Sequence, residues 1–123
     1  MKGRPVGKRQ LNMRPMDSER EVFDREMFAC NTMQDEILQK EILGLFFSQL
    51  ATVRARLEQG PVSAEESKFL AHTLRGAAAA VGAKKIETIA GKWEAKSSTS
   101  AKLRLEISRA AVEFIEFATP ILK

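Results

Sequence analysis

Hydrophobic residues recur every three or four positions over four long stretches of the chain, which is the spacing of amphipathic α-helices. The stretches cover residues 34–59, 63–81, 84–96 and 103–121. In the first of them, the hydrophobic positions are Leu38, Ile42, Leu45, Phe46, Leu50, Val53 and Leu57. Loops of about two to five residues join the stretches, and no alternating strand pattern competes with them. The chain is therefore predicted to be all-α, an up-down antiparallel four-helix bundle.

Helix start and stop signals fall between these stretches. Gly60-Pro61 ends the first, because glycine suits a left-handed cap and proline cannot continue a helix. Ser63 and Glu66 form a capping box that starts the second, and Gly82 stops it. Asn31-Thr32, with Asp35 three residues later, is expected to cap the helix over residues 34–59.

A shorter amphipathic helix is predicted before the bundle, over residues 17–29. Its hydrophobic positions are Val22, Phe23, Met27 and Phe28. Phe23 is expected in the core, with Phe28 either in the core or on a docking surface. The single cysteine, Cys30, has no partner for an internal disulfide, which fits a reducing compartment. It is expected to be a small buried hydrophobic residue.

The basic character of the chain is concentrated at its N-terminus. The net charge is +4, but residues 1–16 hold five of the 20 basic residues and no acidic one, which leaves 15 basic against 16 acidic residues over 17–123. Residues 1–16 also carry glycines and prolines without apolar periodicity, so a flexible arm is expected, followed by one bundle domain over 17–123. With no long apolar run, the chain is expected to be cytoplasmic, away from membranes.

The helix predicted over residues 63–81 carries the only histidine of the chain on its outward face. Its hydrophobic stripe consists of Leu70 together with Leu74, Ala77, Ala78 and Val81, which lie within about 80° of Leu70 on a helical wheel. His72 points away from that stripe, among Arg75, Gly76 and Ala79. An exposed mid-helix glycine costs about 1 kcal/mol relative to alanine. Either Gly76 clears space for a partner to approach the imidazole, or it is neutral drift beside a solvated histidine.

This outward face belongs to a motif that reads His72-Thr73-Leu74-Arg75-Gly76-Ala77-Ala78 and closes with Val81-Gly82-Ala83. The motif resembles the signature of histidine-containing phosphotransfer (HPt) domains, in which His is followed by any residue, an aliphatic, Lys or Arg, Gly and small residues. The resemblance extends over residues 23–123 through the lengths and order of the helices. Arg75 stands where Lys is commoner in the family. Arginine keeps the positive charge but carries it on a planar guanidinium group, which alters the hydrogen bonding.

The resemblance implies that His72 accepts a phosphoryl group on Nε2 from a phospho-aspartate of a receiver domain and passes it to another receiver. The implied partners are receivers of hybrid histidine kinases and response regulators, with Mg²⁺ on the receiver and no cofactor on this chain. Arg75 is the expected positive charge. Lys68 is a second candidate, for which a solvated helix face is the preferred explanation. Ala79 leaves the face bare for docking. Glu94 stands where the family often carries Gln or Glu, and its carboxylate can hold the imidazole but would repel a phosphoryl group.

The residue types argue against a self-contained enzyme. One histidine and one distant cysteine are too few for a metal site, and no glycine-rich phosphate loop with its lysine is present. Together with the resemblance, this implies a phosphocarrier without kinase activity of its own, and a monomer is expected. Two other interpretations stay open. One is a scaffold that binds receivers without phosphorylation, and the other is a small nucleic-acid-binding bundle that uses the basic arm.

Overall fold

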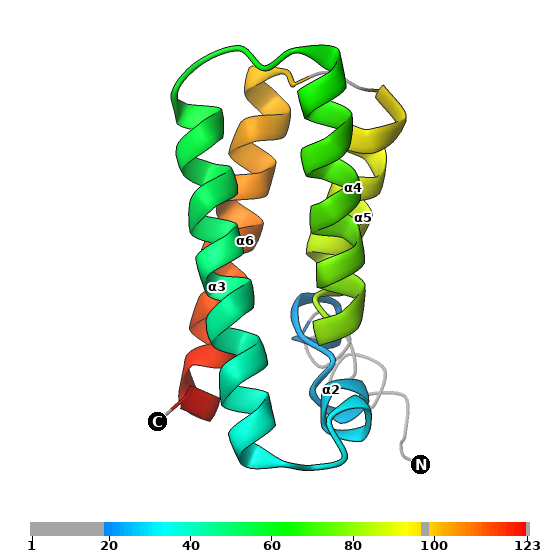
Figure 1. The fold of residues 1–123 in the computed structure, drawn as a ribbon, viewed down its shortest axis with the longest axis vertical. Coiled ribbons are helices and arrows are strands. Elements are labelled where there is room, and N and C mark those ends of the chain that lie inside the picture. Colours follow the sequence, from blue (N-terminus) through cyan, green and yellow to red (C-terminus); the bar gives the residue numbers. More distant parts are fainter. Residues whose placement is uncertain (1–18, 97–98, 123) are drawn as a thin grey trace, which may run out of the picture.

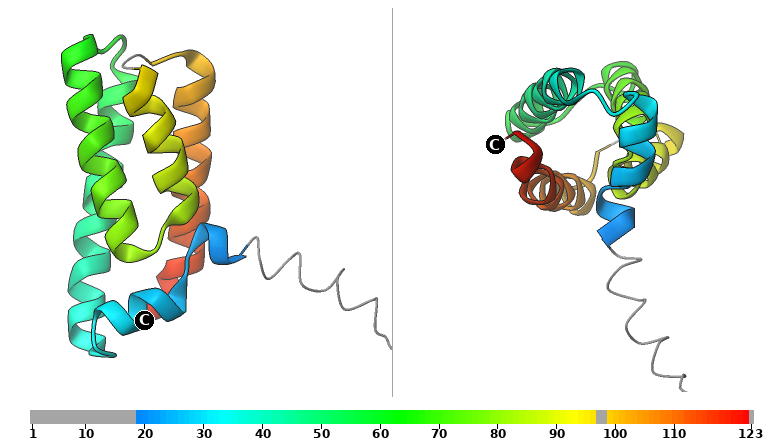
Figure 2. Two further views of the ribbon diagram at one scale, coloured as in Figure 1. Left: turned by 90° about the vertical axis from the view of Figure 1, so that its right-hand side faces the viewer. Right: turned by 90° about the horizontal axis from the view of Figure 1, so that it is seen from below.

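Four long helices pack side by side and run alternately up and down in the computed structural model, which describes residues 19–96 and 99–122 (Figure 1). The elements are α2 (Arg25–Asn31), α3 (Glu36–Glu58), α4 (Ala64–Val81), α5 (Lys84–Lys96) and α6 (Ala101–Leu122). The short α2 lies across one end of the bundle (Figure 2). No strand occurs in the described ranges. The predicted fold class, an up-down antiparallel bundle with a short additional N-terminal helix, is confirmed.

The predicted arm over residues 1–16 lies outside the described residues, so its flexibility stays a prediction. None of the described helices combines the length and the apolar character that a membrane span needs.

Aromatic side chains fill the centre of the bundle. Phe114 of α6 is fully buried and meets Phe23, Phe46 and Phe47, with ring centroids 5.0, 5.2 and 6.1 Å away. These contacts are edge-on, the arrangement that the charge distribution of aromatic rings favours. The prediction that Phe23 lies in the core is confirmed, since it is 2% exposed. The segment before α2 is thus anchored through Phe23.

The ends of α4 follow the predicted signals. Ser63 caps the helix, and its hydroxyl accepts the backbone N–H of Glu66 at 3.1 Å. The Glu66 carboxylate does not turn back to Ser63 but accepts two hydrogen bonds from Arg56 of α3, at 2.8 and 2.9 Å. Gly82 ends α4 with a φ of 81°, in the left-handed region that favours glycine. Glu66 therefore links α4 to α3 through Arg56.

The prediction of one unbroken helix over residues 17–29 is wrong. Residues 19–22 are helical, Phe23 and Asp24 are not, and α2 begins at Arg25. The Asp24 carboxylate accepts the backbone N–H of Met27 at 3.1 Å, which caps α2. Its own backbone N–H donates to the carbonyl of Gly82 at 2.8 Å. Capping and this tertiary bond together outweigh the continuous helical pattern.

The predicted cap of α3 is also displaced along the chain. Asp35 is the N-cap, and its carboxylate accepts the backbone N–H of Leu38 at 3.1 Å. Thr32 is buried instead, and its hydroxyl donates to the carbonyl of Phe28 at 2.8 Å. Thr32 therefore ends α2 rather than starting α3, because residues 33 and 34 turn the chain with positive φ values.

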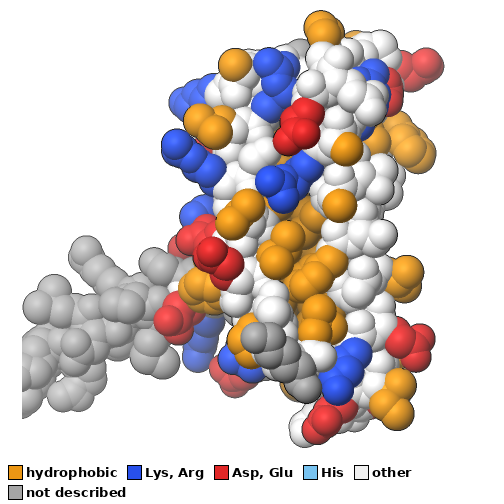
Figure 3. Space-filling model, turned by 90° about the vertical axis from the view of Figure 1, so that its left-hand side faces the viewer, with side chains coloured by type: hydrophobic (Ala, Val, Ile, Leu, Met, Phe, Trp, Pro, Cys, Tyr) orange, Lys and Arg blue, Asp and Glu red, His pale blue; other side chains and the backbone are white. Residues whose placement is uncertain are grey.

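Two expected core residues lie at the surface. Leu45 is 72% exposed, whereas Leu43 is fully buried. Residues 42–53 contain no charged residue, so periodicity alone does not decide which leucine of α3 faces inward. Hydrophobic side chains run down the middle of the face that α3 and α6 present (Figure 3).

Cys30 is exposed rather than buried, because α2 turns Phe28 inward and places Cys30 on its other side.

Candidate functional site

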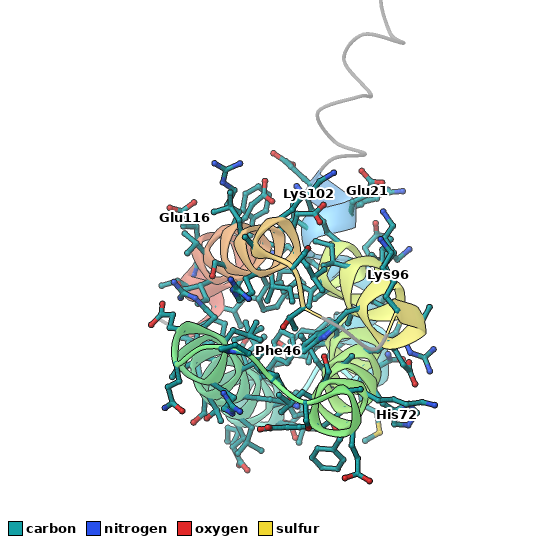
Figure 4. All side chains as sticks on the ribbon, turned by 90° about the horizontal axis from the view of Figure 1, so that it is seen from above. Glu21, Phe46, His72, Lys96, Lys102 and Glu116 are labelled. Carbon is teal, nitrogen blue, oxygen red and sulfur yellow. The ribbon has the colours of Figure 1, made fainter. Side chains whose placement is uncertain are left out.

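His72 projects from the outer surface of α4. Its side chain is 67% exposed, and Figure 4 shows it pointing away from the bundle, whereas Phe46 points into the interior. The opposite side of α4 is anchored by Ala71, Leu74 and Ala78, which are fully buried. A rigid, well-packed helix therefore presents the imidazole to solvent, on the face that the sequence pattern predicted.

Glu94 of α5 holds one nitrogen of this ring. Its Oε2 lies 2.9 Å from Nδ1 of His72, and its side chain is 21% exposed. The hydrogen bond from His72 lowers the pKa of Glu94; partial desolvation raises it, and the hydrogen bond and charge of Arg75 lower it further. The net effect keeps the carboxyl ionised at neutral pH, and an ionised carboxylate only accepts hydrogen bonds.

The tautomer of His72 follows from this contact. Nδ1 must carry a proton in order to donate to Glu94, so the neutral ring has its lone pair on Nε2. Within the part of the chain that the structure describes, no hydrogen-bond partner is found for Nε2. The ring is oriented by one nitrogen and open to attack an electrophile with the other.

Arg75 also binds Glu94. Its Nε donates to Oε1 of Glu94 at 2.7 Å, and the Arg75 side chain is 44% exposed. The sequence predicted Arg75 as a positive charge near the ring, but not its attachment to the carboxylate. The cation and the anion expected beside the imidazole therefore form an ion pair with each other.

The turn after His72 is bare. A Cβ built at Gly76 would meet nothing within 4 Å, and Ala79 adds only a half-buried methyl group one turn further. Lys68 is exposed on the preceding turn and makes no ion pair with a described residue. The predicted open approach to the imidazole is present in the structure, while the roles of Gly76, Ala79 and Lys68 stay predictions.

Three further residues around the site were not predicted from sequence. Phe69 lies one turn before His72 and is 68% exposed. Its exposure could have been predicted, because Phe69 lies outside the hydrophobic stripe of α4. Gly91 of α5 lies against the stem of Arg75, and a glycine inside a predicted helix is the available signal. Ser67 is fully buried, and its hydroxyl accepts the indole N–H of Trp93. The helical period that turns Leu70 and Leu74 inward also places Ser67 on that face, and this position is the available signal.

More than half of the chain matches a known protein family. A family model described as the Hpt domain matches residues 41–117, which is more than half of the chain. The matched range includes His72, Arg75, Gly76 and Glu94. The comparison with curated proteins found no match, and neither did the comparison with solved structures.

Proposed function

The chain belongs to the Hpt domain family, and from this membership we propose that His72 carries a phosphoryl group between two receiver domains. Hpt domains are the phosphocarriers of two-component phosphorelays and interact with receiver domains. One observation supports His72 as the carrier in particular. Its Nδ1 is tied to Glu94, and its Nε2 faces solvent on a rigid helix.

The proposed reaction is an in-line transfer from an aspartyl phosphate. The lone pair of Nε2 forms the new N–P bond while the P–O bond to the receiver aspartate breaks, and the aspartate carboxylate leaves with that electron pair. The proton on Nδ1 stays in its hydrogen bond, so the phosphorylated ring gains a positive charge that the Glu94 carboxylate faces. Transfer to a second receiver is the reverse of these steps. The receiver is expected to supply the Mg²⁺ that offsets phosphoryl charge.

The surface around His72 suits contact with another protein. The exposed ring of Phe69 and the bare turn at Gly76 lie on the same side of α4 as the imidazole. A shallow apolar hollow of about 160 Å³ lies between α3 and α4, lined by Leu45, Ala77 and Ala80 among others. An apolar surface of this kind, on the same helix as an accessible nucleophile, favours docking of a globular partner over binding of a small free substrate.

The proposed location is the cytoplasm, and the proposed state is a monomer. Cys30 is an exposed free thiol, which suits a reducing compartment. Together with the family assignment, this feature favours a carrier that works among intracellular receiver domains.

The proposal is tested by incubating the protein with a receiver domain that carries radiolabelled aspartyl phosphate. The wild type should gain an acid-labile, base-stable label, and His72→Gln should gain none while its circular dichroism stays unchanged. Thr73→Ala is the matched control, because Thr73 is the exposed neighbour of His72 on α4. Label on His72→Gln would assign the chemistry to another residue. A wild type that binds the receiver without taking label would be a scaffold.

A further inference from the structure

The two oxygens of the Glu94 carboxylate have different partners. Oε2 meets Nδ1 of His72 at 2.9 Å, and Oε1 accepts the Nε hydrogen of Arg75 at 2.7 Å. The guanidinium is therefore attached to the carboxylate oxygen that the ring does not use. Arg75 reaches the histidine through Glu94 rather than by a bond of its own to the ring.

Gly91 gives the side chain of Arg75 its path across α5. A Cβ built at Gly91 would lie 3.5 Å from Cδ of Arg75, which is ordinary van der Waals contact. Any longer side chain at this position would compete with the arginine stem for the same space. Gly91 precedes Glu94 by about one helical turn, so the stem that passes over Gly91 ends with its Nε at the Glu94 carboxylate.

The arrangement meets an electrostatic difficulty of the proposed carrier. A phosphoryl group bonded to Nε2 and the carboxylate hydrogen-bonded to Nδ1 would lie on two sides of the same imidazole. Their separation would be well inside the Debye length of about 8 Å. Like charges at that separation repel, so Glu94 alone would oppose the phosphorylation that it prepares by orienting the ring. A cation fixed to the other carboxylate oxygen removes most of that repulsion.

We infer that Arg75 assists phosphoryl transfer by neutralising Glu94, and that Gly91 provides the room for it to do so. This inference rests on the proposed function of His72. Arg75 is then a positioning residue for the charge of the site and not a direct ligand of the phosphoryl group. Its removal should be harmful only while Glu94 is charged.

A double-mutant cycle tests this dependence. The wild type, Arg75→Gln, Glu94→Gln and the double variant are treated with phosphoramidate, which donates its phosphoryl group to the histidine nitrogen and releases ammonia without any docking partner. Arg75→Gln should slow labelling of His72 by about tenfold. Adding Glu94→Gln should restore most of that rate, because a glutamine oxygen still accepts the Nδ1 hydrogen but carries no charge.

Salt and substitution at Gly91 give independent measurements. The deficit of Arg75→Gln relative to the wild type should shrink as salt is raised, since salt screens exposed charges. Gly91→Leu should resemble Arg75→Gln and should be rescued by Glu94→Gln in the same way. The exposed pair Arg20 and Glu26, at 3.3 Å, supplies control substitutions that remove one charge away from the site.

The outcomes separate this inference from the proposed function. A double variant as slow as Arg75→Gln would mean that Arg75 binds the phosphoryl group directly, and the inference would be wrong. Nitrogen NMR of the ring adds a second criterion, because Nδ1 should remain protonated in folded Arg75→Gln. Loss of that tautomer would make Arg75 a structural support only. A wild type that takes no label from phosphoramidate or from a receiver would remove the proposed function itself.

Discussion

Trp93 donates its indole N–H to the hydroxyl of Ser67 at 2.5 Å, and both side chains are completely buried. Ser67 belongs to α4 and Trp93 to α5, so the bond joins the inner sides of the two helices whose outer sides carry His72 and Glu94. Trp93 is also the direct neighbour of Glu94 in the chain. The buried bond therefore fixes the register in which the carboxylate meets the imidazole.

Loss of this bond should destabilise the bundle. Ser67→Ala leaves the indole N–H buried without its acceptor, which is expected to lower the free energy of unfolding by about 1–3 kcal/mol. Urea denaturation followed by the fluorescence of Trp93 measures the change. Ser48→Ala, at an exposed position of α3, is the control and should stay within about 0.5 kcal/mol of the wild type. Equal midpoints for the wild type and Ser67→Ala would show that the bond adds no stability.

Gly82 should tolerate no side chain, unlike Gly44. Gly82 has a φ of 81°, and a Cβ there would lie 2.8 Å from the backbone oxygen of Asp24. Gly82→Ala is expected to cost about 2 kcal/mol in the free energy of unfolding, from the left-handed conformation and the overlap together. A Cβ at Gly44 meets nothing within 4 Å, so Gly44→Ala should stabilise α3 by about 1 kcal/mol. Thermal unfolding of the two variants should shift in opposite directions.

Acid should weaken the α4–α5 contact through Glu94. The pKa of Glu94 is lowered from its ordinary value of 4.5, chiefly by the hydrogen bond from His72. The unfolded chain therefore binds this proton more readily, so the stabilisation is complete above the unfolded pKa and is lost as pH falls through the folded one. Glu94→Gln should show a smaller loss of stability than the wild type between about pH 6 and pH 3. Superimposable pH profiles of urea midpoints would contradict this expectation.

Much of the fold could be predicted because local signals and packing agree. Gly82 and Ser63 mark the ends of α4 through backbone chemistry that depends on few neighbours. Prediction from the sequence failed where tertiary contacts determine the bounds of a helix or its buried face. Asp24 interrupts the first helix because its N–H bonds to Gly82. The prediction that Leu45 lies in the core is wrong because residues 42–53 of α3 contain no charged residue that would mark the outward face.

The candidate site divides in the same way. The outward position of His72 follows from the period of α4, which the sequence contains. The ion pair of Arg75 and Glu94 depends on how two helices are aligned, 19 residues apart in the chain. The contact between Gly91 and the side chain of Arg75 is likewise visible only in the structure. Pairings between helices therefore need the structure, whereas the outward face of α4 does not.

Phe69 should contribute to receiver binding without contributing to stability. It is 68% exposed and shares the side of α4 that carries His72. Burial of its ring in a complex would make Phe69→Ala weaken the affinity for a receiver by about tenfold, equivalent to about 1.4 kcal/mol. Leu105→Ala is the control, at a 51% exposed position on α6. Calorimetric titration with an unphosphorylated receiver gives both affinities, and equal losses would show that the α4 face is not the docking surface.

Gly76 should matter for access rather than for folding. A Cβ there meets nothing within 4 Å, so Gly76→Ala should raise the free energy of unfolding by about 1 kcal/mol, the usual gain of alanine over glycine in a helix. Gly76→Gln should fold equally well, but its longer side chain would occupy the turn beside His72 and hinder an approaching receiver. We expect transfer from a phosphorylated receiver to slow by about tenfold or more in Gly76→Gln. Labelling by the small donor phosphoramidate should change much less, because that donor needs less room. If both donors label Gly76→Gln at the wild-type rate, the open turn serves no purpose in docking.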